Sequence, residues 1–143
     1  MAETSDNPGQ DEGLLFQVRP LKQARQDCVD LFQSDREMQW VISQLRLLAH
    51  WPLDAKRQER LGSDLSFSKV RHRGETFYEL RLDDARLHQR NLRVFFWVHD
   101  EGKTIWIIHA YWKKANRLDE QVKIRVARRI KTLKGRIQDG SVR

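Results

Sequence analysis

Basic residues stand at the ends of three apolar segments in the second half of the chain. Arg81 lies near the end of one segment, Arg93 near the start of the next, and Lys113 and Lys114 close the third. Guanidinium and ammonium groups that converge on one surface can bind phosphate, and a guanidinium can form two parallel hydrogen bonds with it. The pattern therefore predicts a surface with the chemistry to hold an RNA backbone.

The elements that must position these groups are β-strands. Side chains alternate between apolar and polar character from Ser66 onward, and valine, isoleucine and aromatic residues are frequent there. Four strands are expected, at residues 66–72, 76–82, 92–98 and 104–112.

Alternation also assigns faces to the strands. It places Arg81 and Arg93 together on a face opposite an apolar row that includes Leu80 and Val94. The expected site is an open face on which these arginines lie among aromatic rings suited to stacking on bases. A cross-strand ion-pair cluster of Glu79 with the two arginines is the alternative.

Helices are expected both before and after these four strands in the sequence. A short strand at 14–18 precedes a helix that Pro20 would begin, and Ser34 followed by Glu37 has the form of a capping box for a second helix. Pro52 should end that second helix. A closing helix is predicted from an apolar stripe with spacings of three and four: Leu118, Val122, Val126, Ile130, Leu133 and Ile137.

Together these elements predict an α+β fold. We expect a small, twisted, antiparallel sheet of three to five strands, covered by an N-terminal helical hairpin and a C-terminal helix. One domain should span 14–138, after a disordered acidic leader at 1–13 and before a short tail at 139–143. Gly102 is expected to supply a positive φ angle in the hairpin turn at 99–103.

Charge points to an acidic partner. The net charge is +7, and residues 113–143 contain 11 lysine or arginine residues but only 3 aspartate or glutamate residues. Such an asymmetric field attracts polyanions, although a solvated helix face is the alternative explanation. The expected RNA-binding residues are in the 83–91 connection and the C-terminal third: Arg86, Arg90, Arg117, Arg128 and Arg129.

The expected compartment and the expected lack of a cofactor both follow from signals that the sequence does not contain. No apolar run reaches the length of a membrane span, no hydrophobic leader is seen, and Cys28 is the single cysteine. We therefore expect a cytoplasmic protein. The histidines have no zinc-like spacing and there is no glycine-rich phosphate loop, so no metal or cofactor is expected.

The order of elements and the local motifs resemble the RelE/ParE toxin superfamily. YELR, LRVFFWV, a glycine-containing turn, IWIIHAYWKK and an amphipathic helix are similar to the phage-derived, HigB-like branch of RelE toxins, over about 61–137. The resemblance implies a type II toxin that cleaves mRNA, generally in the ribosome, without a metal. It also implies an antitoxin partner, usually a small helix-turn-helix protein encoded next to the toxin.

The resemblance also implies roles for individual residues. Arg93 matches the arginine of the family's central strand, Arg81 the basic residue of the preceding strand, and Lys113 and Lys114 the closing lysine pair. Many members use a tyrosine or histidine near the C-terminus as acid or base, but the last residues here, IQDGSVR, contain neither.

The nearby substitutes are Tyr111, His109, Tyr78 and Glu79. A buried His109 bonded to the backbone is the alternative to a catalytic one. Two other functions remain open: a ParE-like inhibitor of DNA gyrase, and a catalytically inactive module that binds RNA or an antitoxin.

Overall fold

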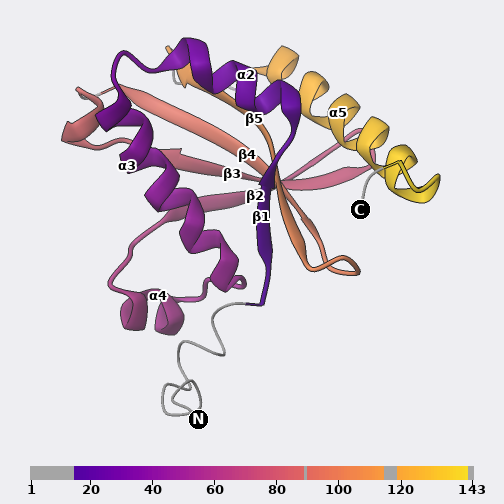
Figure 1. The fold of residues 1–143 in the computed structure, drawn as a ribbon, viewed down its shortest axis with the longest axis horizontal. Coiled ribbons are helices and arrows are strands. Elements are labelled where there is room, and N and C mark those ends of the chain that lie inside the picture. Colours follow the sequence, from indigo (N-terminus) through magenta and orange to yellow (C-terminus); the bar gives the residue numbers. More distant parts are fainter. Residues whose placement is uncertain (1–14, 89, 115–118, 142–143) are drawn as a thin grey trace.

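The alternating segment forms strands in the computed structural model, which describes residues 15–88, 90–114 and 119–141. The elements, in chain order, are β1 (Gln17–Pro20), α2 (Lys22–Leu31), α3 (Asp35–Arg46), the 3₁₀ helix η2 (Leu47–His50), α4 (Ala55–Leu61), β2 (Ser66–His72), β3 (Glu75–Leu82), the 3₁₀ helix η3 (Ala85–Leu87), β4 (Asn91–His99), β5 (Thr104–Lys113) and α5 (Glu120–Gln138). The protein is therefore an α+β domain (Figure 1).

The sheet has five strands in the order β1-β5-β4-β3-β2. Strands β2 to β5 form an antiparallel meander, as the sequence predicted. The expectation of a wholly antiparallel sheet is wrong, because β1 pairs in parallel with β5 from Gln17↔Thr104 to Pro20↔Ile107. Parallel strands need a long connection, and here most of the domain separates the two.

The first strand and the first helix begin later than predicted. The strand starts at Gln17 and contains Pro20 as its last residue, whereas the helix starts at Lys22. Proline has no N–H to contribute to a ladder and is tolerated on edge strands, and β1 is an edge strand. Leu14, the first residue of the predicted strand, and the predicted leader at 1–13 lie outside the described residues.

Helix α2 covers the part of β5 that β1 does not reach. The Leu21 N–H donates to the Ile107 carbonyl at 2.9 Å, just where the pairing of β1 with β5 ends. At the other end of α2, the Trp112 indole N–H donates to the Leu31 carbonyl at 3.0 Å. The helix thus shields the exposed edge of β5, a device that prevents unwanted strand pairing.

Helices α3 and α5 cover opposite faces of the sheet. On one face, the Trp51 ring that follows η2 packs on Tyr78 and Phe96, with ring centroids 4.9 and 5.4 Å away. On the other face, Lys134 of α5 lies over Trp97 of β4. Figure 1 shows α2 between these two helices. The predicted helical hairpin therefore covers one face and one edge, and the predicted C-terminal helix covers the second face.

Local capping explains where the helices begin and end. The Ser34 hydroxyl accepts a hydrogen bond from the Glu37 N–H at 3.2 Å, which is one half of the predicted capping box. Helix α4 is capped by Asp54, whose side chain accepts a hydrogen bond from the Arg57 N–H, and is ended by Gly62 at φ 68°. A left-handed glycine is a common helix terminator because it has no Cβ to clash.

The hairpin turn between β4 and β5 differs from the prediction. Gly102 does not have a positive φ, and the left-handed conformation falls on Lys103 at φ 49°. A Cβ atom at Gly102 would lie 2.7 Å from Nδ1 of His99, so the glycine leaves space for that ring. Close approach, rather than backbone conformation, is the reason for a glycine here.

Candidate functional site

The two predicted arginines are direct cross-strand neighbours. Arg81 of β3 pairs with Arg93 of β4, and Arg93 pairs in turn with Tyr111 of β5. Residues directly opposite each other on neighbouring strands have close Cβ atoms, so these side chains form one row across the sheet. The sequence prediction that Arg81 and Arg93 share a face is confirmed.

A cavity of about 660 Å³ lies at this end of the sheet. Two serine or valine positions and seven charged residues line it: Ser68, Lys69, Val70, Arg71, Glu79, Arg81, Arg93, Lys113 and Lys123. Basic residues predominate, and Glu79 is the one acid among those lining residues. We call this cavity the basic pocket; an anion would find a strongly positive potential there.

Arg93 lines the basic pocket with a largely buried side chain. Its side chain is 12% exposed, and its Nε lies 3.5 Å from a carboxylate oxygen of Glu79, which is 17% exposed. Nε and Nη1 of Arg93 are buried and make no hydrogen bond within the described residues. Buried N–H donors normally have partners, so this guanidinium has donor capacity for a ligand.

The alternative of an ion-pair cluster describes only part of this site. Glu79 pairs with Arg93, but the exposed Arg81 donates from Nη2 to the Ser68 hydroxyl at 3.1 Å. The expected open face is also different from what we predicted, because α5 covers it. Phe77 and Phe95 are buried, so these rings cannot stack on bases as the sequence suggested.

The lysine pair at the end of β5 is divided. Lys113 is half-buried and lines the basic pocket, whereas Lys114 is exposed and is not among the lining residues. Successive side chains of a strand point in opposite directions, which explains the difference. The pocket thus gathers three of the four residues from which the prediction started.

Tyr111 lies beside the basic pocket without lining it. Its ring stacks on Phe95 with an interplanar angle of 11°, and the residue is half-buried. Burial raises the pKa of the phenol, the negative charges of Glu79 and Asp119 raise it further, and Arg93 opposes them. Tyr111 therefore holds its proton at neutral pH and could act as a proton donor.

His109 belongs to a buried polar cluster that joins three elements. Its Nδ1 lies 2.7 Å from an Asp27 carboxylate oxygen, and Arg129 of α5 donates to the same oxygen at 2.9 Å and to the Ile108 carbonyl at 2.9 Å. Burial lowers the pKa of His109, and the neighbouring Asp27 only partly offsets this. A neutral imidazole that donates from Nδ1 to the carboxylate fits these contacts. The predicted burial of His109 is found, with a carboxylate rather than the backbone as partner.

Four of the predicted RNA-binding residues, Arg86, Arg90, Arg128 and Arg129, do not line the basic pocket. Arg86 pairs with Asp84 at 3.1 Å, and Arg90 bonds Glu37, so both have partners within the protein. Arg128 is exposed on α5, Arg129 is engaged by Asp27, and Arg117 falls outside the described residues.

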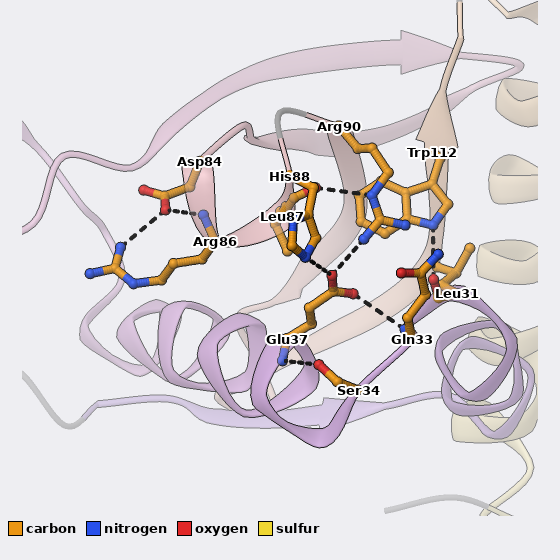
Figure 2. Close-up of polar contacts among 10 residues, drawn as sticks. All are labelled: Leu31, Gln33, Ser34, Glu37, Asp84, Arg86, Leu87, His88, Arg90 and Trp112. Atoms are coloured by element: carbon orange, nitrogen blue, oxygen red, sulfur yellow. Dashed lines mark hydrogen bonds and ion pairs between the residues drawn. The ribbon is translucent and has the colours of Figure 1, made fainter.

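Glu37 is the centre of a network that the sequence did not indicate (Figure 2). The carboxylate is buried and receives a hydrogen bond from Arg90 at 2.7 Å, with the His88 ring at 3.3 Å. The Arg90 guanidinium also lies over the Trp112 ring, 4.1 Å from its centroid. The network therefore joins α3, through Glu37, to His88 and Arg90 after η3 and to Trp112 at the end of β5, next to Lys113.

Three basic residues of the pocket were not identified from the sequence. Lys69 and Arg71 come from the edge strand β2, and Lys123 from the first turns of α5. The edge position of β2 was the available signal, since long side chains on an edge strand can bend toward a neighbouring cavity. Lys123 could not be found this way, because its position depends on how α5 packs on the sheet.

Further properties of the described part of the chain complete the picture. No group of three or more metal-ligating side chains is found among the residues that the structure describes, and none of the described helices is long and apolar enough to span a bilayer. No protein-family model, curated protein or solved structure matches this chain.

Proposed function

We propose that this protein is an endoribonuclease of the RelE/HigB type that binds and cleaves RNA in the basic pocket. The order of elements, with a first strand, a helical pair, an antiparallel meander and a closing helix, supports this assignment. So does the convergence of Arg81, Arg93 and Lys113 on one cavity.

The unsatisfied guanidinium of Arg93 carries the proposal. Two of its nitrogens are buried without a hydrogen-bond partner within the described residues, in a cavity lined by five other basic side chains. A phosphodiester supplies anionic oxygens that accept such hydrogen bonds. A neutral ligand would leave the surplus positive charge of the pocket uncompensated.

The proposed chemistry is an internal transfer at phosphorus. The 2′-oxygen of a ribose attacks the adjacent phosphorus and the bond from phosphorus to the 5′-oxygen breaks, which leaves a 2′,3′-cyclic phosphate and a free 5′-hydroxyl. A base takes the proton of the 2′-hydroxyl, and an acid returns a proton to the 5′-oxygen. Arg93 and Arg81 stabilise the charge that develops on the phosphate oxygens.

The two proton-transfer groups come from the same end of the sheet. Glu79 lines the pocket and bears a carboxylate, which makes it the proposed base. Tyr111 adjoins Arg93 and keeps its proton, which makes it the proposed acid. His109 is excluded from either role, because Asp27 and Arg129 hold it in a buried cluster.

A cytoplasmic toxin of this class requires a partner that inhibits it. By resemblance, the expected partner is a small helix-turn-helix antitoxin encoded next to this protein, and the target is mRNA on the ribosome. An antitoxin that covers the basic pocket would present acidic side chains to it.

The test is expression in a bacterium, followed by mapping of transcript ends. We expect growth arrest and new mRNA ends bearing a 5′-hydroxyl, and Arg93→Ala should lower cleavage by about 10²–10³-fold, the usual effect of losing one charge-stabilising donor. Arg36→Ala, at an exposed site on α3, is the matched control and should remain toxic.

Other outcomes would replace the proposal. Filamentation and DNA damage with intact transcripts would indicate a gyrase inhibitor. Purified protein that binds RNA with a steep salt dependence but never cuts it, with or without ribosomes, would indicate an inactive relative.

A further inference from the structure

A second cavity lies between α2 and α3 and differs in character from the basic pocket. Its volume is about 400 Å³. Its lining residues come from β1, α2, α3 and β5: Val18, Pro20, Ala24, Arg25, Cys28, Val29, Phe32, Met38, Val41, Ile42, Leu45, Arg46 and Ile107. We call it the hairpin groove; its volume falls within the range of about 300–1,000 Å³ found for small-molecule sites.

The groove is apolar except for two arginines. Arg25 and Arg46 are exposed, and neither makes an ion pair or a side-chain hydrogen bond with any residue in the described part of the chain. No aspartate or glutamate is among the lining residues. Burial raises the pKa of the Cys28 thiol to about 11, so this side chain adds no negative charge.

The cations are placed on one side of the groove. The two helices diverge from the short connection between them (Figure 1), and Phe32 and Met38 lie beside that connection. Arg25 is in the first turn of α2 and Arg46 is the last residue of α3, so both are on the side away from the connection. Two apolar lining residues, Phe32 and Met38, therefore lie toward the connection, whereas the two cations lie toward the far ends of the helices.

We propose that the hairpin groove binds a single-chain carboxylate amphiphile of the fatty-acid class. The hydrocarbon chain contacts the apolar lining toward Phe32 and Met38, and the carboxylate lies at Arg25 and Arg46. A docked protein helix fits less well, because its polar rim would run along both sides of the groove, whereas the two cations lie only toward the ends of α2 and α3 that are away from the connection.

Exposed apolar surface supports the inference. Val29 is 64% exposed and lines the groove, so the apolar lining of the cavity continues to the outside of the protein, where a hydrocarbon chain could cover it. The site also stands apart from the basic pocket, since no residue lines both cavities.

The experiment is titration of the full-length protein with dodecanoate below its micellar concentration, monitored by calorimetry and by amide chemical shifts. One dodecanoate should bind per chain, with shifts confined to β1, α2, α3 and the part of β5 around Ile107. Dodecanol, the neutral analogue, should bind at least tenfold more weakly.

Two variants locate the ligand. Arg25→Gln with Arg46→Gln should weaken dodecanoate binding at least tenfold and leave dodecanol binding unchanged, and Arg36→Gln, also exposed on α3 but outside the lining, should have no effect. Val29→Glu replaces an exposed side chain, so it should fold normally and repel the carboxylate.

Three results would overturn the proposal. They are equal affinity for dodecanoate and dodecanol, shifts that map to the basic surface of α5, and unchanged dodecanoate affinity in the double arginine variant. The last two would assign any binding to general attraction by the positive charge of the protein.

Discussion

Replacing Glu37 with glutamine preserves the size of this side chain but removes its charge. The native carboxylate is buried, with a side chain that is 4% exposed, and Arg90 donates to it at 2.7 Å. The substitution keeps an oxygen that can accept from the Gln33 N–H, a contact of 3.3 Å in the native protein. The variant thus isolates the charge–charge part of the network shown in Figure 2.

The expected loss of stability follows from the burial of the two partners. A hydrogen bond to a charged group contributes about 1.5–3 kcal/mol, and breaking a fully buried pair costs about 3–5 kcal/mol. The Arg90 side chain is 29% exposed, so water compensates it in part after the substitution. His88 is largely exposed and contributes little. We expect a decrease in the unfolding free energy of about 2 kcal/mol, or about 6 °C in Tm for a chain of this size.

The assay is equilibrium unfolding in urea, followed by tryptophan fluorescence and by circular dichroism. The matched control is Asp84→Asn, which removes the charge of an ion pair with Arg86 that is exposed on both sides. Asparagine can still accept from the Arg86 N–H, as Asp84 does at 2.9 Å. The control should lose no more than about 0.5 kcal/mol, as is usual for a surface pair.

The comparison of the two variants tests whether burial strengthens the Glu37–Arg90 ion pair. If Glu37→Gln loses no more stability than Asp84→Asn, then burial does not strengthen the Glu37–Arg90 pair. The proposal that this network fixes the end of β5 beside Lys113 would then have no energetic basis.

Two further predictions concern the sheet. Glu79→Gln removes the charge that competes for Arg93, so single-stranded RNA should bind about fivefold more tightly while cleavage slows, and unchanged affinity in filter binding would contradict this account. The second concerns His109, whose pKa is lowered by burial below its ordinary value of 6.5, so the unfolded chain binds a proton more readily than the folded one. Its stabilising effect is complete above about pH 6.5 and decreases as the pH falls toward the folded pKa. The unfolding free energy of native protein should therefore fall more steeply from pH 7 to pH 5 than that of His109→Gln, and parallel profiles would refute the assignment.

The strands were predictable because alternation is a local property. Four of the five were located within one or two residues from side-chain period alone, and Ser34 marked the start of the second helix correctly. The end of that helix was placed too late, because α3 ends at Arg46 and only the 3₁₀ helix η2 continues to His50, before Pro52. The parallel pairing of β1 was not predictable in this way. It depends on partners more than 80 positions apart, from Gln17 to Thr104, and no local pattern encodes such a register.

The site was predicted in outline for a similar reason. Alternation correctly grouped Arg81 with Arg93, and the position of Lys113 at the end of a strand brought it to the same pocket. Alternation does not reveal which helix covers which face, so the burial of Phe95 under α5 could not be foreseen. The burial of Glu37 was equally hidden, because a capping box indicates only a contact between this side chain and the backbone at the start of the helix.

The parallel pairing of β1 with β5 has a consequence for biosynthesis. Residues 17–20 leave the ribosome early, but their partner residues 104–107 are among the later ones to be synthesised. The amino-terminal strand and the helix that follows it along the same edge must therefore wait for the meander before they can dock. A nascent chain halted before Thr104 would lack β5, the strand with which its own first strand pairs, so the native sheet cannot be completed before β5 has been synthesised.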